Sequence, residues 1–188
     1  MPSQKPPAGL RPWPELGREH LADCRVFQVG RSWVRVPGGG SHPFYRIDAD
    51  SWVNVVPVTA SGEIVMIRQF RHGSQSFTLE IPGGVVDPGE GPEQAAGREL
   101  EEETGYRAHS LRPLGDLNPN PALFGNRVFT YAAEGCERVG EIENPGMEET
   151  VVELVPRAEL PERVRRGEID HALVVAALHF WSLDSAAS

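Results

Sequence analysis

The sequence predicts an α/β fold in which a mixed sheet carries helices on both faces and follows a small antiparallel β meander. Two observations support this prediction: strands and helices follow one another in mixed order, and many glycines and prolines separate the Val- and Ile-rich segments. The chain has 188 residues, enough for one domain with a core and a small extension. We therefore expect an N-terminal extension in residues 1–48 and a second domain in residues 49–188.

The N-terminal extension is expected to form the meander. Its first ~18 residues are rich in proline and are expected to be irregular. Two segments of alternating apolar residues, CRVFQV and SWVRVP, are joined at Gly30-Arg31, and a third, PFYRID, follows the turn GGGSH. Alternation of this kind is typical of half-buried strands, so three short antiparallel strands are predicted.

The second domain begins with segments that predict a sheet. A hairpin is expected from WVNVVPVT and EIVMIRQFR around the turn ASGE, and FTLEIPGG predicts a strand that ends in a Gly-Gly turn. Pro92 near a first helical position and Gly105 just past the end delimit a helix of about twelve residues. Further strands are predicted at residues 126–134 and 149–156, and further helices at 157–169 and 170–183.

Composition excludes several classes of function. The net charge of −9 repels nucleic acid, so no nucleic-acid partner is expected. No segment approaches the ~18 apolar residues of a membrane helix, and the N-terminus lacks the apolar region of a secretory signal. Cys24 and Cys136 lie in no metal-ligand spacing and are expected to be free thiols in a reducing cytoplasm.

The stretch RELEEETG concentrates acidic residues inside the predicted helix. At 100° per residue, Glu99, Glu102 and Glu103 share one face, whereas Glu101 points elsewhere and is expected to be solvated. A solvated acidic face is the alternative, but it predicts interleaved lysines or arginines, and only Arg98 is present. Clustered carboxylates without side-chain cations favour Mg²⁺, with Mn²⁺ as a possible substitute.

The spacing around this helix resembles the Nudix box, G-x5-E-x7-R-E-U-x-E-E-x-G-U, in which U is a bulky apolar residue. Tyr106 at the last position is aromatic and departs mildly from the pattern. Every other fixed position matches, and the matching residues are Gly84, Glu90, Arg98, Glu99, Leu100, Glu102, Glu103 and Gly105.

The resemblance implies an α/β/α sandwich and a metal-dependent enzyme that cleaves a diphosphate. It makes Glu99 and Glu103 the principal metal ligands, with Glu102 beside them and the carbonyl of Gly83 as a backbone ligand. Arg98 is expected to orient the glutamates.

Three further residues of the box have structural roles in this resemblance. Glu90 ties the loop to the helix through Arg98. Gly84 and Gly105 occupy positions where a side chain would obstruct the turn or the exit from the helix.

Outside the box the chain resembles the ADP-ribose and nucleoside-diphosphate-sugar pyrophosphatases. The similar segments are VMIRQFRHG, TLEIPGG, the closing helices RRGEIDHALVVAALHFW and the position of Pro121. In that subfamily an acidic loop before the last strand supplies the catalytic base, which here points to Glu149 or Glu148, with Glu149 preferred. At least one of the two is expected to be a solvated loop acid.

The same resemblance suggests residues for binding a nucleotide sugar. Arg71 is expected to bind a phosphate, although a surface cation is the alternative, and Glu80 is expected near the metal site, where it could contact substrate or an arginine. A base needs a planar group to stack on, and the candidates, each of which could instead belong to the core or a dimer interface, are Trp52, Tyr45, Phe44 and, more weakly, Arg46.

Those enzymes are typically homodimers, and a homodimer through the meander is expected here. Exposed Trp13, Phe27, Trp33 and Phe44 suit such an interface, since so small a sheet cannot bury them alone. Two alternatives stay open for the function. The chain could act on another nucleotide diphosphate, such as a nucleoside triphosphate, coenzyme A or a dinucleoside polyphosphate, or be an inactive Nudix-like sensor, which the intact box disfavours.

Overall fold

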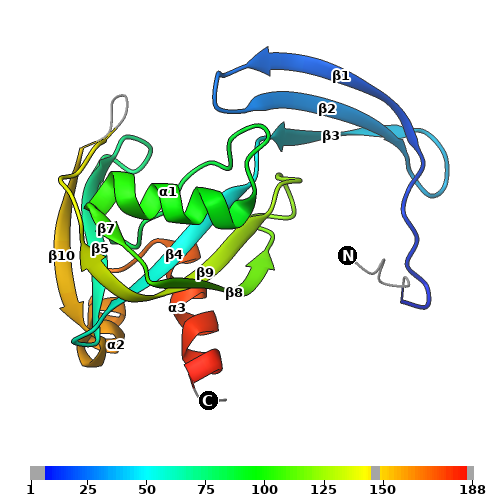
Figure 1. The fold of residues 1–188 in the computed structure, drawn as a ribbon. Helices are drawn as coiled ribbons and strands as arrows, with labels where there is room; N and C mark the ends of the chain where they lie inside the picture. Colours follow the sequence, from blue (N-terminus) through cyan, green and yellow to red (C-terminus); the bar gives the residue numbers. More distant parts are fainter. Residues whose placement is uncertain (1–6, 145–148, 186–188) are drawn as a thin grey trace. The chain divides into compact units, whose positions relative to one another are not determined.

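The chain forms two compact units. The computed structural model describes residues 7–144 and 149–185 (Figure 1). The smaller unit runs to Ala49 and also contains Asn120–Gly125, whereas the larger unit consists of Asp50–Pro119 and the chain from Asn126 onward.

The smaller unit is a three-stranded antiparallel sheet, which confirms the predicted meander. Its strands, in the order β1-β2-β3, are β1 (Glu15–Asp23), β2 (Gln28–Arg35) and β3 (Ser41–Asp48). All nine residues of β1 are exposed within this chain. The segment Asn120–Gly125 joins the edge of β3, where the backbone N–H of Ile47 donates to the carbonyl of Leu123 at 2.8 Å.

The strand boundaries in this sheet differ from the prediction. β1 begins inside the stretch that was expected to be irregular, and β2 runs unbroken through Gly30 and Arg31, which were predicted to form a turn. The turn lies before β2, at Arg25, whose φ is 64°. Gly30 is buried, and a Cβ there would lie 3.3 Å from Nη2 of Arg46. The glycine therefore makes room for a guanidinium group and does not break the strand.

The larger unit is built around a seven-stranded mixed sheet with the order β10-β5-β4-β9-β7, to which β6 adds beside β5 and β8 beside β9. β4 and β9 are parallel, and the other pairs are antiparallel. The strands are β4 (Trp52–Thr59), β5 (Glu63–Arg71), β6 (Ser76–Glu80), β7 (Tyr106–Arg107), β8 (Ser110–Leu117), β9 (Val128–Arg138) and β10 (Thr150–Pro156).

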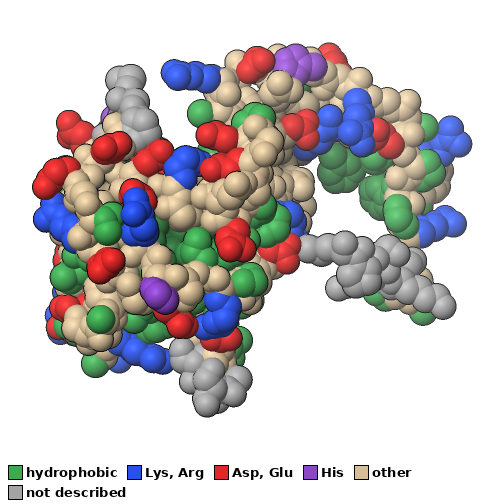
Figure 2. All heavy atoms as spheres, in the orientation of Figure 1, with side chains coloured by type: hydrophobic (Ala, Val, Ile, Leu, Met, Phe, Trp, Pro, Cys, Tyr) green, Lys and Arg blue, Asp and Glu red, His purple; other side chains and the backbone are tan. Residues whose placement is uncertain are grey.

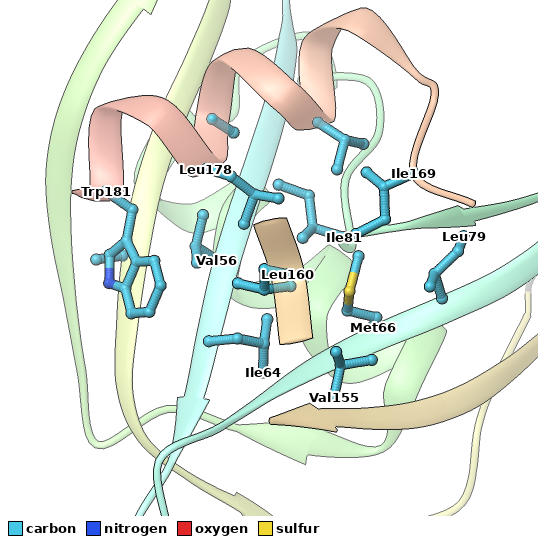
Figure 3. Close-up of a cluster of buried hydrophobic side chains, with 13 residues drawn as sticks. Val56, Ile64, Met66, Leu79, Ile81, Val155, Leu160, Ile169, Leu178 and Trp181 are labelled. Carbon is cyan, nitrogen blue, oxygen red and sulfur yellow. The ribbon is translucent and has the colours of Figure 1, made fainter. Parts of the chain in front are cut away.

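Helices cover both faces of this sheet, as predicted (Figure 1). The helix α1 (Pro92–Thr104) packs on one face through Ala95, Ala96 and Leu100. On the other face lie the 3₁₀ turn η1 (Arg157–Glu159), α2 (Leu160–Arg165) and α3 (Ala172–Ser185). Figure 3 shows the core on that face, where Leu178 and Trp181 of α3 and Leu160 of α2 meet Ile64 and Met66 of β5.

The strand β8 has no counterpart in the prediction. It contains Pro113, which cannot donate a ladder hydrogen bond, and Gly115, whose φ is 154°, and its register with β9 shifts between these two residues. β8 pairs with β9 alone, and an edge strand tolerates a proline and a bulge that would disrupt a central strand.

Charged side chains of both signs are scattered over the face that Figure 2 displays. Acidic side chains, in red, alternate with Lys and Arg, in blue, and the whole chain carries a net charge of −9. Among the helices of the described residues, none has the length and apolar character needed to span a membrane. Both cysteines are free, as predicted, with Cys24 exposed and Cys136 buried.

Candidate active site

The helix α1 is delimited by glycine at both ends. Gly91 caps its start, and the backbone N–H of Gly91 donates to the side chain of Gln94 at 3.0 Å. Gly105 ends it in the left-handed conformation, with φ of 71° and its N–H bonded to the carbonyl of Glu101. A Cβ at Gly105 would lie 2.4 Å from the carbonyl oxygen of Gly140. Only glycine therefore fits the exit from the helix.

Arg98 connects the acidic face of α1 to the loop that precedes it. Its Nε and Nη2 atoms donate to the two carboxylate oxygens of Glu90 at 3.0 Å each, and Nη2 also donates to the carbonyl of Val85. Nη1 donates to Glu99 at 2.9 Å and to Glu102 at 3.1 Å. The hydrogen bond with Glu90 raises the pKa of Arg98, so the guanidinium group stays charged. The ion pairs expected from the spacing are present.

Glu103 and Glu99, two of the predicted metal ligands, lie against the glycines of the loop before α1. Glu103 is 4 % exposed, and its Oε2 accepts the backbone N–H of Gly83 at 2.9 Å. A Cβ at Gly84 would lie 2.4 Å from Oε1 of Glu99. These glycines therefore let the loop lie directly against the carboxylates.

The backbone of this loop directs one carbonyl toward α1. The carbonyls of Pro82 and Gly84 accept hydrogen bonds from Val55 and Val53 of β4, at 2.9 Å each. Peptide groups alternate in direction along a chain that pairs in this way. The carbonyl of Gly83 therefore faces away from β4, on the side where the N–H of Gly83 meets the carboxylate of Glu103.

The side chains on this face fit a hard divalent cation. Every predicted ligand is an oxygen atom, which is the donor type that Mg²⁺ and Mn²⁺ prefer. Within the described residues no three carboxylate, imidazole or thiolate groups are already gathered closely enough to hold a metal ion. Arg98 contacts Glu99 and Glu102, while the Gly83 N–H contacts Glu103.

The opposite face of α1 is closed by a different ion pair. Glu101, which was expected to be solvated, is half-buried and accepts two hydrogen bonds from Arg107, at 3.0 and 2.7 Å. Between α1 and β8 lies an open hollow of about 600 Å³. Neither Glu99 nor Glu103 lines the hollow, so it is separate from the carboxylate face. The lining residues are Glu93, Gln94, Gly97, Arg98, Glu101, Arg107, Ala108 and Leu111.

Glu80 and Arg71 form a bidentate pair on the β5–β6 hairpin. Nε and Nη2 of Arg71 donate to the two oxygens of Glu80 at 2.9 Å each, and the Glu80 side chain is 3 % exposed. Thr78 donates a third hydrogen bond, and Nδ1 of His171 lies 3.2 Å from Oε2. Burial raises the pKa of Glu80, but the contacts with Arg71, His171 and Thr78 outweigh it and hold the pKa below its ordinary value. Glu80 is therefore a buried anion that orients Arg71.

The remaining predicted residues are distributed over both units. Glu149 is exposed and immediately precedes β10, whereas Glu148 lies outside the described residues. Trp52 of β4 forms a bridge with Val85, beside the start of the box.

Two of the predicted base-binding residues are neighbours in the smaller unit. Tyr45 pairs with Arg31 and Arg46 with Gly30, and successive side chains of a strand point to opposite faces. Tyr45 and Arg46 therefore leave opposite faces of β3. Arg46 donates to Asp48 and to Ser32 within its own sheet.

No sequence pattern pointed to Thr150 and Asn144, which lie near the C-terminal end of α1. The hydroxyl of Thr150 lies 2.8 Å from the carbonyl oxygen of Glu103 and 3.1 Å from the side chain of Asn144. These contacts join segments that are far apart in the chain, and no local spacing encodes them.

Comparisons with known proteins show which family the chain belongs to. The family model of the NUDIX domain matches residues 51–178, which include the whole box. The chain is 33 % identical over 165 residues to the ADP-ribose pyrophosphatase of Mycobacterium tuberculosis (strain ATCC 25618 / H37Rv), covering 87 % of this chain and 80 % of that protein.

Two further similarities differ in their extent. The chain is 48 % identical over 91 residues to the ADP-sugar pyrophosphatase of Mus musculus, covering 47 % of this chain and 42 % of that protein. A solved structure of an ADP compounds hydrolase superposes with a TM-score of 0.78 at 25 % identity, covering 92 % of this chain and 94 % of the other. With the box intact on α1 and the family model spanning most of the larger unit, the chain is a member of the Nudix hydrolase family.

Proposed function

We propose that this Nudix pyrophosphohydrolase cleaves the diphosphate of ADP-ribose or a related nucleoside diphosphate sugar, giving a nucleoside monophosphate and a sugar phosphate. The observation that supports it most is the contact of Glu103 with the backbone of Gly83 and the close approach of Glu99 to Gly84, beside the predicted acidic face of α1. The relatives named as ADP-ribose and ADP-sugar pyrophosphatases support the choice of substrate.

The box residues are assigned to holding the metal. Nudix hydrolases generally require divalent metal ions, and we assign Mg²⁺ to Glu99, Glu103 and the Gly83 carbonyl, with Glu102 beside them. When bound, such ions neutralise the diphosphate oxygens and acidify the attacking water. Arg98 keeps the glutamates oriented through its hydrogen bonds.

Residues outside the box are assigned to the substrate and the proton. Arg71 binds a phosphate, and Glu80 fixes the plane of its guanidinium group. Glu149 acts as the general base: it takes the proton from the water as the new P–O bond forms and the bridging P–O bond breaks. Trp52 is the candidate within the same unit for stacking on the base.

The decisive experiment is a substrate panel with Mg²⁺. ADP-ribose, GDP-mannose, UDP-glucose, dGTP and coenzyme A are incubated with the protein, and the products are separated by anion-exchange chromatography. We expect AMP and ribose 5-phosphate from ADP-ribose as the fastest reaction. Release of pyrophosphate from dGTP, with no cleavage of any diphosphate sugar, would overturn the proposal.

Two glutamate variants test the assigned metal site. Glu103→Gln should lower kcat at least about a hundredfold, because it removes an anionic ligand. Glu101→Gln is the matched control on the same helix and should retain activity within about threefold, since the Glu101 side chain bonds Arg107 and none of the box residues. Equal losses in the two variants would contradict the assigned face.

A further inference from the structure

Residues 139–144, which follow β9, cap the C-terminal end of α1. The last carbonyls of a helix have no partner within the helix and need one elsewhere. The backbone N–H of Glu143 donates to the carbonyl of Glu102 at 2.8 Å, and the N–H groups of Val139 and Gly140 donate to Gly105 at 2.9 and 3.2 Å. Residues 139–144 therefore run along the C-terminal end of α1, the helix that carries the proposed metal ligands.

Thr150, the first residue of β10, also contacts the C-terminal end of α1. Its side chain is buried, and the hydroxyl lies 2.8 Å from the carbonyl oxygen of Glu103 and 3.1 Å from Oδ1 of Asn144. A hydroxyl has one proton, so it can donate to only one of these oxygens. If the hydroxyl donates to Glu103, the amide of Asn144, turned about its last bond, presents an N–H that the hydroxyl accepts. Both contacts are then satisfied at once.

The hydroxyl thus joins three segments at Glu103. The carbonyl of Glu103 is held by Thr150, and its carboxylate is held by the N–H of Gly83. Asn144 connects Thr150 to residues 139–144. Glu149 is bonded directly to Thr150 in the chain, so the position of its backbone follows from the same contacts.

We propose that Thr150, supported by Asn144, is a positioning residue that fixes Glu149 relative to the glutamates of α1. The inference rests on the proposed function, in which Glu149 takes a proton from the attacking water. A general base acts only within hydrogen-bond reach, and a displacement of about 1 Å can cost a hundredfold in rate. One hydroxyl at the junction of base and metal ligand therefore controls the chemical step.

The test is a double-mutant cycle with Thr150→Val and Glu149→Gln. Valine keeps the shape of threonine and removes the hydroxyl. For the best substrate of the panel we expect kcat to fall about ten- to a hundredfold in Thr150→Val, with KM changed less than about threefold. In the Glu149→Gln background the same change should have almost no further effect on kcat, since there is no base left to position.

Further variants separate positioning from folding. Thr150→Ser keeps the hydroxyl and should restore kcat to within about threefold, and Asn144→Ala should lower kcat about tenfold or less while leaving the Thr150–Glu103 contact in place. The matched control is Thr130→Val. Thr130 is 1 % exposed, and its hydroxyl has no hydrogen-bond partner in the part of the chain that the structure describes. This variant should keep the kcat of the wild type.

The possible failures are distinguishable. A wild-type protein that cleaves no diphosphate sugar overturns the proposed function and the role of Glu149 with it. An active wild type overturns the positioning role alone if Thr150→Val keeps its kcat, if the losses of Thr150→Val and Glu149→Gln multiply, or if Thr150→Ser fails to restore the rate. If Thr150→Val does not fold, Asn144→Ala in the same cycle with Glu149→Gln decides between these outcomes.

Discussion

Arg98 and Arg71 hold their glutamates in two different ways. Arg98 donates hydrogen bonds to three glutamates and lies 3.9 Å from the carboxylate of Asp87, whereas Arg71 gives two parallel hydrogen bonds to Glu80. The Glu80 side chain is 3 % exposed and that of Arg71 is 42 % exposed, so the pair is buried at its carboxylate end only. A buried carboxylate that loses its cation is costly, which makes Glu80 dependent on Arg71. Arg71 is therefore the partly exposed partner of the pair, and its contact with a substrate phosphate stays a proposal.

The lowered pKa of Glu80 predicts a dependence of stability on pH. The folded protein keeps Glu80 deprotonated at pH values where the unfolded chain, with an ordinary pKa of 4.5, binds a proton. The carboxylate therefore stabilises the fold above this pKa, and the stabilisation is lost as the pH falls toward the lower folded pKa. The stability gap is the difference in free energy of unfolding between wild type and Glu80→Gln. We expect this gap to narrow by about 1.4 kcal/mol per pH unit below pH ~4.5. Urea unfolding between pH 7 and pH ~3.5 measures it.

Glu101→Gln is the control for this prediction. Arg107 lowers the pKa of Glu101 as well, but the pair is exposed and screened by solvent. Its stability gap should therefore change far less over the same pH range. A gap for Glu80→Gln that stayed constant, or widened, on acidification would show that Glu80 does not hold its charge in the folded protein.

The sequence predicts a residue well where a fixed spacing encodes its partner. The resemblance to the Nudix box, whose residues have a fixed spacing, implies the bonds of Arg98 with the box glutamates, and these bonds are present. The contacts of Thr150 with Glu103 and Asn144 could not be predicted, because the fold brings them together across 47 and 6 residues without a recurring pattern. Arg107 was missed in the same way as the partner of Glu101.

At the scale of the element, α1 combines packing and charge on adjacent stripes. Ala95, Ala96 and Leu100 are buried against the sheet, and Glu103 is buried beside them. Carboxylates crowded on one helix repel each other, and the single charge of Arg98, which contacts Glu99 and Glu102, offsets only part of this repulsion. The helix is therefore expected to be more stable when a divalent ion is bound to it.

Mg²⁺ should raise the melting temperature of the protein. At a concentration about a hundredfold above its Kd, binding stabilises the fold by about 2.7 kcal/mol, or about 5–10 °C for a chain of this size. The shift should largely disappear in Glu99→Gln and Glu103→Gln and persist in Glu101→Gln. Differential scanning calorimetry before and after EDTA measures it. A shift of the same size in all three variants would locate the metal away from this face.

The elements differ in how far the sequence predicts them. α1 has its first and last residues close to the predicted limits because Pro92 and Gly105 act locally. β8 was not predicted, since its proline and bulge fit only an edge strand and the sequence does not show which strand is at the edge. The prediction wrongly ended a strand at Gly30, which lies inside β2. A glycine is present there because the guanidinium group of Arg46, on the neighbouring strand, occupies the space that a side chain would need.

At the scale of the whole molecule, the smaller unit has a sheet that is incompletely covered by its own chain. Trp13 is 43 % exposed and Phe44 is 49 % exposed, and their rings are 6.2 Å apart, whereas Phe27 and Trp33 are half-buried. A three-stranded sheet needs a packed apolar face to be stable. A second copy of the chain is the partner we propose for it.

Light scattering should give a mass of twice 20.6 kDa at micromolar concentration. Phe44→Asp places a charge in the proposed interface and should yield the monomer. Phe77→Asp is the matched control, because Phe77 is 77 % exposed on β6 of the larger unit. A wild-type mass of one chain contradicts the dimer, and dissociation by Phe77→Asp instead of Phe44→Asp places the interface on the other unit.

Residues 120–125 give the smaller unit a discontinuous origin in the gene. Their backbone joins β3 at Ile47, although they are encoded between β8 and β9. The two units are therefore not interchangeable as blocks of sequence. A chimera that takes its N-terminal sheet from a relative must also take residues 120–125 from that relative, or the transplanted edge of β3 meets a foreign segment.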